Sequence, residues 1–258
     1  MINEWELVST NLHRLKNRRY EVAVIPTCAI EAHNFHLPEG QDMLHTTHVV
    51  RAACEAAWPR CESVICLPAI PYGVDCNLMD FPLSIHVSQD TLNAMLRDII
   101  KSLRHYGIRK IVLVNGHGGN DFVPFVRQIQ SDMDVHVFVC NWWTVGADQY
   151  TSIFTNPDDH AGEQETSIAL HLFPDLVEPG VASDGKARPF RFEALRKGWV
   201  KTSRDFGRLN DHCAVGDPSQ ANADKGRRYL EIVIPRIVDF LVECAKTPID
   251  EVFPHSEK

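Results

Sequence analysis

Residues 21–30 read EVAVIPTCAI, an apolar run with several β-branched residues that predicts a buried β-strand. Three further apolar runs, at 63–70, 110–116 and 134–143, predict strands of the same kind. Strands that are apolar along nearly their whole length are typical of a parallel sheet that is buried on both faces. These four runs therefore favour an α/β fold.

Helical segments alternate with these strands, as expected for a layered α/β protein. The amphipathic segment 88–107 has a suitable N-cap in Ser88 and a terminating glycine in Gly107. Further helices are predicted at 121–133, 162–173 and 221–246. Since no repeat, low-complexity tract or linker divides the chain, residues 1–258 are expected to form a single domain.

Composition excludes several function classes. A net charge of −8 without a basic stripe argues against a nucleic-acid or anionic-membrane partner. No apolar stretch approaches the roughly 20 residues of a membrane span, and the first residues lack the apolar core of a signal peptide. The eight cysteines are scattered without a CxxC pair, so we expect a reduced, cytoplasmic protein without disulfides.

The segment AIEAHNFHLPEGQDMLHTTH (29–48) places four histidines and three carboxylates together, directly after the first strand. In an extended chain, Glu31 and His33 share a face, and a turn can return Asp42 to the same point. Mixed nitrogen and oxygen ligands suit zinc, manganese or iron(II). The alternative is a polar loop whose histidines only make hydrogen bonds within the protein. We expect His45 and His48 to be helix residues rather than ligands.

The second cluster, VLVNGHGGND (112–121), follows a predicted buried strand. It offers His117 as a ligand, and the backbone at Gly118 is free to approach a bound molecule. A plain turn remains possible, because Asn-Gly and Gly-Gly pairs are common in turns. A phosphate loop or dinucleotide-binding loop does not fit, because the glycine spacing differs and no Lys-Ser/Thr pair follows.

The third cluster, DDHAGEQETS (158–167), precedes and enters a predicted helix. His160 is a candidate general acid or base, and Glu165 is a candidate ligand or the orienting partner of that histidine. The alternative is structural: Asp158 or Asp159 caps the helix, and Glu163 favours its N-terminus. Taken together, the three clusters suit a hydrolase whose metal-activated water attacks a carbonyl.

The motifs EAHNFHLPEGQD, NGHGGN and HAGEQETS occur in this order, and GDP follows at 216–218. With them the sequence resembles the creatininase, or creatinine amidohydrolase, family over roughly residues 20–240. The resemblance implies a three-layer α/β/α hydrolase with a largely parallel central sheet and one or two divalent metals (Zn, Mn or Fe(II)) in each subunit. It also implies a homo-oligomer, often a hexamer.

The resemblance assigns roles residue by residue. Glu31, Asp42 and His117 would hold one metal. His33 and Asp42 would hold the other, so that Asp42 bridges the two. His160 would transfer protons in catalysis.

One position departs from creatininase itself, which carries a metal-binding glutamate where this chain has Gly119. Either Glu165, the acidic residue that matches the third family motif, supplies the missing ligand, or the second metal site is weak or empty.

The substrate is expected to be a small polar molecule. The segment 71–88 would form a loop over the site and bring Tyr72, Asp75 and Asn77 to it, a polar set that slightly favours a hydroxyl-rich ligand. Creatininase covers its substrate with a tryptophan, and Trp142 and Trp143 are either such a pocket wall or core residues.

These observations predict hydrolysis of an amide C–N bond in a cyclic substrate. The alternative within the family is ring opening by C–C hydrolysis of an oxidised inositol or a sugar-like cyclic ketone. A non-catalytic metal-binding scaffold is a third interpretation, against which the complete set of polar site residues speaks.

Overall fold

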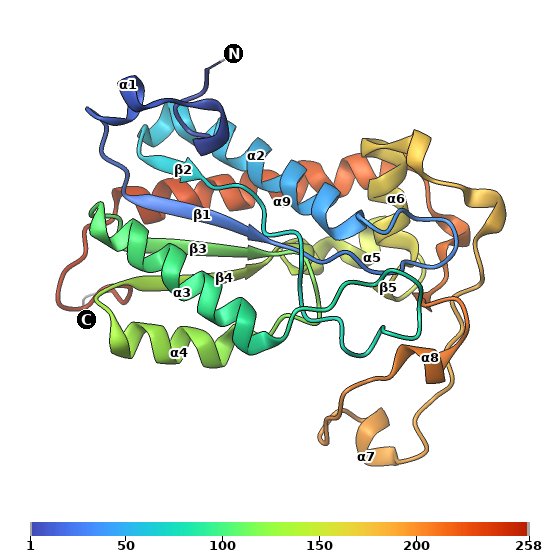
Figure 1. Cartoon of the computed structure of the whole chain (residues 1–258). Helices are drawn as coiled ribbons and strands as arrows, with labels where there is room; N and C mark the ends of the chain where they lie inside the picture. Colours follow the sequence, from blue (N-terminus) through green and yellow to red (C-terminus); the bar gives the residue numbers. More distant parts are fainter. Residues whose placement is uncertain (1, 257–258) are drawn as a thin grey trace.

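The computed structural model describes residues 2–256 and is built around a four-stranded sheet (Figure 1). The strand order is β2-β1-β3-β4, and all neighbouring strands pair in parallel. The strands are β1 (Val22–Thr27), β2 (Val64–Cys66), β3 (Lys110–Asn115) and β4 (His136–Asn141). The predicted parallel sheet is confirmed, and each strand lies inside a predicted apolar run.

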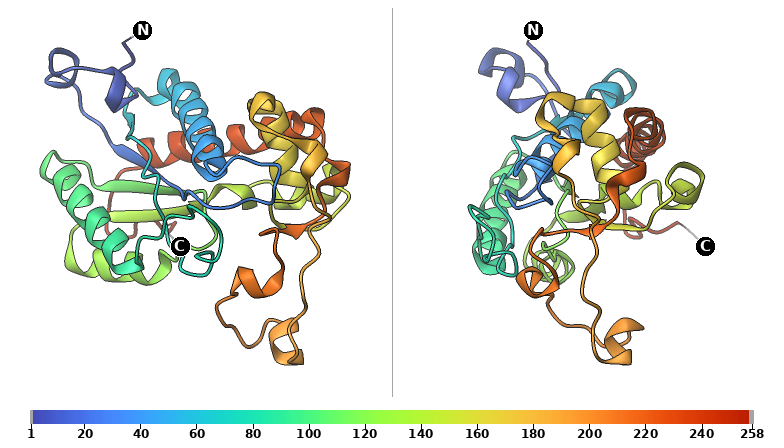
Figure 2. Two further views of the ribbon diagram at one scale, coloured as in Figure 1. Left: turned by 45° about the vertical axis from the view of Figure 1, so that its right-hand side comes forward. Right: turned by 90° about the vertical axis from the view of Figure 1, so that its right-hand side faces the viewer.

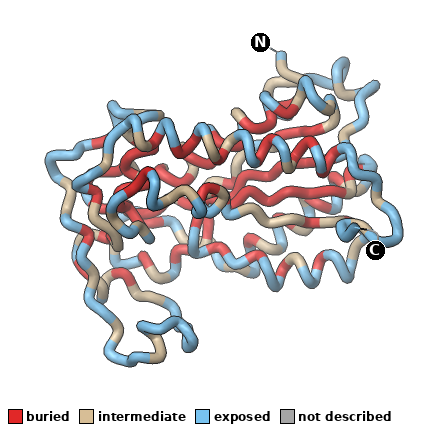
Figure 3. Tube along the Cα trace, turned by 180° about the vertical axis from the view of Figure 1, so that it is seen from behind, coloured by how far each residue is buried: buried red, intermediate tan, exposed pale blue. Residues whose placement is uncertain are grey.

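Helices cover both faces of the sheet, which confirms the three-layer architecture (Figures 1 and 2). On one face lie α2 (Gln41–Cys61) and α9 (Ala223–Lys246), and on the other lie α3 (Gln89–His105) and α4 (Val123–Asp132). Along β1 the side chains alternate between the two cores: Val24 faces α2 and α9, whereas Ile25 faces α3 and α4. Figure 3 shows the resulting continuous buried centre.

The predicted ends of α3 are confirmed. The Ser88 hydroxyl accepts a hydrogen bond from the backbone N–H of Thr91, as an N-cap does, and Gly107 has a φ of 88° just after the helix. The start of α2 was not predicted. It begins at Gln41, so Asp42 lies in the first helical turn rather than in a loop, and His45 and His48 are helix residues as expected.

A second, two-stranded antiparallel sheet pairs β5 (Asp158–His160) with β6 (Val215–Gly216). Helix α6 (Glu163–Leu172) follows β5 and packs against α9. The short helices are α1 (Leu12–Leu15), α5 (Tyr150–Ile153), α7 (Glu193–Arg196) and α8 (Phe206–Leu209). Single 3₁₀ turns occupy Leu7–Ser9, Trp142–Thr144, Ala147–Gln149, Pro174–Leu176, Pro179–Val181 and Pro218–Gln220.

Residues 186–205, which we call the arm, extend away from the layered body (Figure 2). None of these residues is buried. All eight cysteines are free. Among the helices of residues 2–256, none has the length and apolarity needed to cross a membrane.

Candidate metal centre and active site

The six polar residues singled out in the sequence converge at the carboxyl edge of the sheet, where parallel α/β sheets bind ligands. They come from three segments that are far apart in the chain, 31–42, 117 and 160–165. Glu31 and His33 follow β1, Asp42 lies in the first turn of α2, His117 follows β3, His160 ends β5, and Glu165 lies in the first turn of α6.

Their side chains form two adjoining groups of ligand atoms. In the first group, Nδ1 of His117 lies 2.8 Å from Glu31 Oε1 and 3.1 Å from Asp42 Oδ2. In the second, Nε2 of His33 lies 3.2 Å from Asp42 Oδ1 and 4.0 Å from Glu165 Oε2. The two oxygens of Asp42 thus face different groups, as in a bridging carboxylate.

This donor set fits divalent metal ions. Carboxylate oxygens and imidazole nitrogens are suitable ligands for zinc, manganese and iron(II). His33 Nε2 and Asp42 Oδ2 are buried and make no hydrogen bond of good geometry, although polar atoms in protein interiors are normally satisfied. A cation between the side chains would satisfy both atoms.

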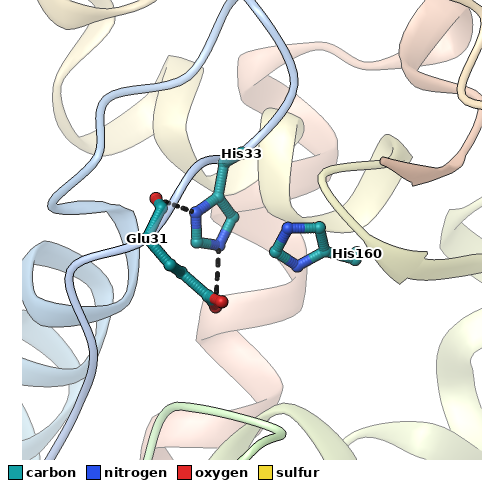
Figure 4. Close-up of side chains that lie close together, drawn as sticks. All are labelled: Glu31, His33 and His160. Carbon is teal, nitrogen blue, oxygen red and sulfur yellow. Dashed lines mark hydrogen bonds and ion pairs between the residues drawn. The ribbon is translucent and has the colours of Figure 1, made fainter. Parts of the chain in front are cut away.

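A third possible group joins Glu31, His33 and His160 (Figure 4). The Nδ1–H of His33 donates to the backbone oxygen of Glu31 at 3.0 Å, which leaves Nε2 as the free nitrogen. The rings of His33 and His160 lie side by side with their centroids 4.4 Å apart. His160 therefore stands at the edge of the candidate centre.

Burial sets the charge of the cluster. It raises the pKa of Glu31 to about 7 and that of Glu165 to about 8. Burial alone would raise the pKa of Asp42 too, but the nearby imidazoles of His117 and His33 hold it below its usual range. Burial would lower the pKa of His33, yet Asp42 raises it to about 10. Positive charge beside these carboxylates is thus strongly favoured.

His160 has a different environment. Its Nε2–H donates to the backbone oxygen of Ala32 at 2.8 Å, so Nδ1 carries the lone pair. Burial lowers the pKa of His160 to about 3, and the neighbouring His33 acts in the same direction. The ring is therefore neutral at physiological pH, with its lone pair on Nδ1. On the Nε2 side it also contacts the sulfur of Cys213 at 3.8 Å.

Gly119 lies under the ring of His117. A Cβ atom at this position would lie 2.3 Å from His117 Nε2 and 2.3 Å from the backbone oxygen of Val74. Any side chain here would displace the histidine or the loop. Glu165, rather than residue 119, brings a carboxylate to His33 and Asp42.

A polar cavity of about 380 Å³ opens above the cluster. Of the predicted substrate contacts, Asn77, Gly118 and Trp143 line it. Its remaining wall includes Cys76, Leu78, Asp159, Gln164, Ser203, Arg204 and Phe206.

Three of the predicted substrate contacts do not line this cavity. Trp142 is buried in the core, where its indole N–H donates to the hydroxyl of Thr46 at 3.0 Å. Tyr72 is 47% exposed and is not part of the cavity wall. Asp75 is fully buried behind His117 and does not reach the cavity either. In a loop, sequence alone does not tell which side each residue faces.

Arg204, which no sequence motif indicated, lines the cavity from the end of the arm. Its guanidinium pairs with Asp159 and lies 5.2 Å from the ring centroid of Phe206. No local motif marks it, because it reaches the cavity only through folding of the arm against β5.

The parallel sheet and the buried carboxylate–imidazole cluster at its edge define an α/β protein with a site typical of metallohydrolases. The family model described as creatininase, or creatinine amidohydrolase, matches residues 6–241. The chain belongs to the creatininase family and is a hydrolase of that family, which confirms the resemblance seen in its motifs.

Similar proteins cover nearly the whole chain. A mycofactocin precursor peptide peptidase from Mycobacterium ulcerans is 30% identical over 87% of this chain and 86% of its own length. The creatinine amidohydrolase of Pseudomonas putida is 26% identical over 86% and 89%. A solved structure from Bacteroides fragilis, provisionally named creatinine amidohydrolase, has a TM-score of 0.89 at 32% identity and covers 97% of this chain and 100% of its own.

More distant similarities extend the range of named activities. A 3-dehydro-scyllo-inosose hydrolase from Thermotoga maritima is 24% identical over 69% of this chain and 58% of its own length. A structure named "Creatininase Mn" has a TM-score of 0.75 at 23% identity and covers 95% of this chain and 100% of its own. At that identity the likeness shows a common fold.

Proposed function

We propose that this chain is a metal-dependent amidohydrolase that cleaves a C–N bond in a small polar, cyclic substrate. The observation that carries the proposal is the position of Asp42, whose two oxygens face two adjoining sets of ligand atoms. Structures named as manganese and "Zn-Zn type" creatininases support divalent metals in such a site.

In this proposal Glu31, Asp42 and His117 hold one metal, and His33, Asp42 and Glu165 hold the other. Glu165 supplies the carboxylate ligand that Gly119, which has no side chain, cannot supply. When bound, divalent metals lower the pKa of water and polarise a substrate carbonyl.

His160 serves as the proton-transfer residue. Its hydrogen bond to the backbone of Ala32 fixes the ring and leaves the lone pair on Nδ1 to accept a proton. A buried, oriented base of this kind suits activation of the attacking water and later protonation of the leaving nitrogen.

The cavity supports a small substrate, since about 380 Å³ lies at the lower end of the range for ligand pockets. A hydroxyl-rich ligand was favoured by the polar loop 71–88, but of Tyr72, Asp75 and Asn77 only Asn77 lines the cavity. The more similar relatives are named for cleavage of amide or peptide bonds. Both points favour amide hydrolysis over ring opening of a cyclic ketone.

The decisive experiment combines metal analysis with an activity assay. Protein purified without chelators is expected to contain about two metals per chain by mass spectrometry, and to hydrolyse creatinine or another cyclic amide in a panel of small amides and short peptides. Asp42→Asn should lose both metals, and His117→Ala one. Asp80→Asn, a change at an exposed position in the loop 71–88, should keep both. A folded wild-type protein that binds no added zinc or manganese would refute the proposal.

A further inference from the structure

Asp75 is a fully buried carboxylate behind the candidate metal centre. Both of its oxygens are inaccessible to solvent and make no hydrogen bond of good geometry. Ionised carboxylates are costly to bury unless a partner compensates the charge. The group that faces Asp75 is the imidazole of His117, whose Nε2 lies 3.0 Å from Asp75 Oδ1.

The two nitrogens of His117 face opposite surroundings. Nδ1 faces the oxygens of Glu31 and Asp42, where the first metal is proposed to bind. Nε2 faces Asp75 Oδ1 and the backbone oxygen of Val74, which lies at 3.1 Å. Since both neighbours of Nε2 are acceptors, the proton belongs on Nε2, and the lone pair on Nδ1 points to the metal position.

The surrounding backbone holds this arrangement in place. A Cβ at Gly119 would lie 2.3 Å from His117 Nε2, and a Cβ at Gly73 would lie 3.1 Å from its Cδ2. The backbone N–H of Asp75 donates to His86 Nδ1 at 3.1 Å, which anchors the loop that carries the carboxylate. Both glycines let the loop and the turn close tightly on the ring, so a rotated imidazole would meet backbone atoms.

We propose that Asp75 is a positioning residue for His117. It fixes the ring in the tautomer that ligates through Nδ1, and its negative charge makes that nitrogen a stronger donor to a divalent cation. Carboxylates that accept the second N–H of a metal-bound histidine generally act in this way. The inference rests on the proposed function, because it requires a metal at the site of Glu31, Asp42 and His117.

The test is a calorimetric titration of metal-free protein. Zinc(II) and manganese(II) are titrated in separate experiments. Asp75→Asn keeps the shape of the side chain but removes its charge, and should weaken one of the two metal sites 10- to 100-fold. Asp80→Asn is the matched control from the same loop and should bind both metals as the wild type does.

A double-variant comparison separates positioning from loop support. In a His117→Ala background, Asp75→Asn should have no further effect on metal affinity, because the residue through which Asp75 acts is gone. An equal loss of affinity with and without His117 would overturn the inference, since it would show that Asp75 supports the site in some other way.

The remaining outcomes are also decisive. Wild-type protein that binds no metal would refute the proposed function and the inference with it. Wild-type protein that binds two metals, together with an Asp75→Asn variant of unchanged affinity, would refute the inference alone. If Asp75→Asn does not fold, crystals of the zinc-loaded wild type decide. We expect zinc on Nδ1 of His117 and Asp75 on Nε2, and ligation through Nε2 would overturn the inference.

Discussion

Gly119 shows how a single absent Cβ determines which residues can form the candidate centre. The glycine lies against His117 Nε2 and Val74, so a carboxylate cannot be supplied from this position without displacing the histidine. Glu165 approaches from α6 instead and brings its carboxylate to His33 and Asp42.

Replacing Gly119 by alanine should consequently weaken metal binding. The new Cβ would overlap His117 Nε2 and the Val74 oxygen, so the ring must shift away from Glu31 and Asp42. We expect loss of at least one metal per chain, measured by mass spectrometry. Gly118→Ala is the matched control, because a Cβ there meets no atom within 4 Å, and it should retain both metals. Full metal content in Gly119→Ala would contradict this account of the glycine.

His160 allows a test that separates a proton-transfer residue from a ligand. If it transfers protons, His160→Gln should lower kcat by roughly 10²- to 10⁴-fold while the metal content stays unchanged. If it belongs instead to the third group with Glu31 and His33, the same variant should lose metal. Steady-state kinetics and metal analysis on one preparation distinguish the two.

For single residues, the sequence predicted the location of those that belong to a motif. It did not predict which way a side chain points where packing decides the orientation. Glu31, His33 and His117 follow strands, so their place at the sheet edge follows from the fold. Asp75 was predicted to contact substrate and Trp142 was left as a pocket wall or a core residue, and both are buried in the protein. A loop and a strand end have two sides, and local sequence does not distinguish them.

Among the elements, α2 has the closest connection to the site. Its first turn carries Asp42, and one turn further His45 is buried between the rings of Trp142 and Phe173, with centroid distances of 5.8 and 5.2 Å. Burial lowers the pKa of His45 to about 3. The helix therefore contains a histidine that is neutral in the folded protein at physiological pH.

This burial predicts a pH dependence of stability. Because the folded pKa of His45 lies below the value of about 6.5 in the unfolded chain, its contribution is complete above that value and is lost as the pH falls. Between pH 7 and pH 5 the loss is about 2 kcal/mol. In urea unfolding of metal-free protein, His45→Leu should remove this part of the pH dependence. His48→Leu, at an exposed position of α2, should leave most of it.

The contact between α6 and α9 positions Glu165. The two helices approach closely at Gly226, where a Cβ would lie 2.1 Å from the backbone oxygen of Ser167. Gly226→Ala should push the helices apart and lower the free energy of unfolding by about 1–3 kcal/mol, despite the better helix propensity of alanine. Thermal unfolding measures the loss. Gly180→Ala meets no atom within 4 Å and should be neutral, so an equal effect of both changes would argue against the helix contact.

Helices and strands were predicted correctly where their sequence pattern extends over many residues. The four parallel strands and helices α3, α4, α6 and α9 lie within the predicted segments, because burial on both faces of a sheet and amphipathic periodicity extend over many residues. β5 and β6, with three and two residues, were missed. Strands of this length carry no periodic pattern and form only when their partner is present.

The whole molecule brings distant segments to one point, and sequence analysis could foresee only part of this. The convergence of three motifs followed from the parallel sheet, whose strand ends share an edge. The return of the arm, which places Arg204 on the cavity, did not follow from any pattern. A single domain over residues 1–258, a cytoplasmic location and a homo-oligomer remain predictions.

The proposed metals would join β1, α2, β3 and α6 through one buried cluster, and their removal should therefore destabilise the whole fold. A ligand that binds only the folded state at 100 times its dissociation constant adds about 2.7 kcal/mol of stability. For a chain of this size that corresponds to a fall in Tm of roughly 5–10 °C on chelation, seen by calorimetry and reversed by added zinc or manganese. Asp42→Asn should be insensitive to the chelator, because the bridging ligand is absent. A wild-type Tm that does not change on removal of tightly bound metal would show that the cluster is already satisfied by its own histidines, with the charges of His33 and His117 in place of the metals.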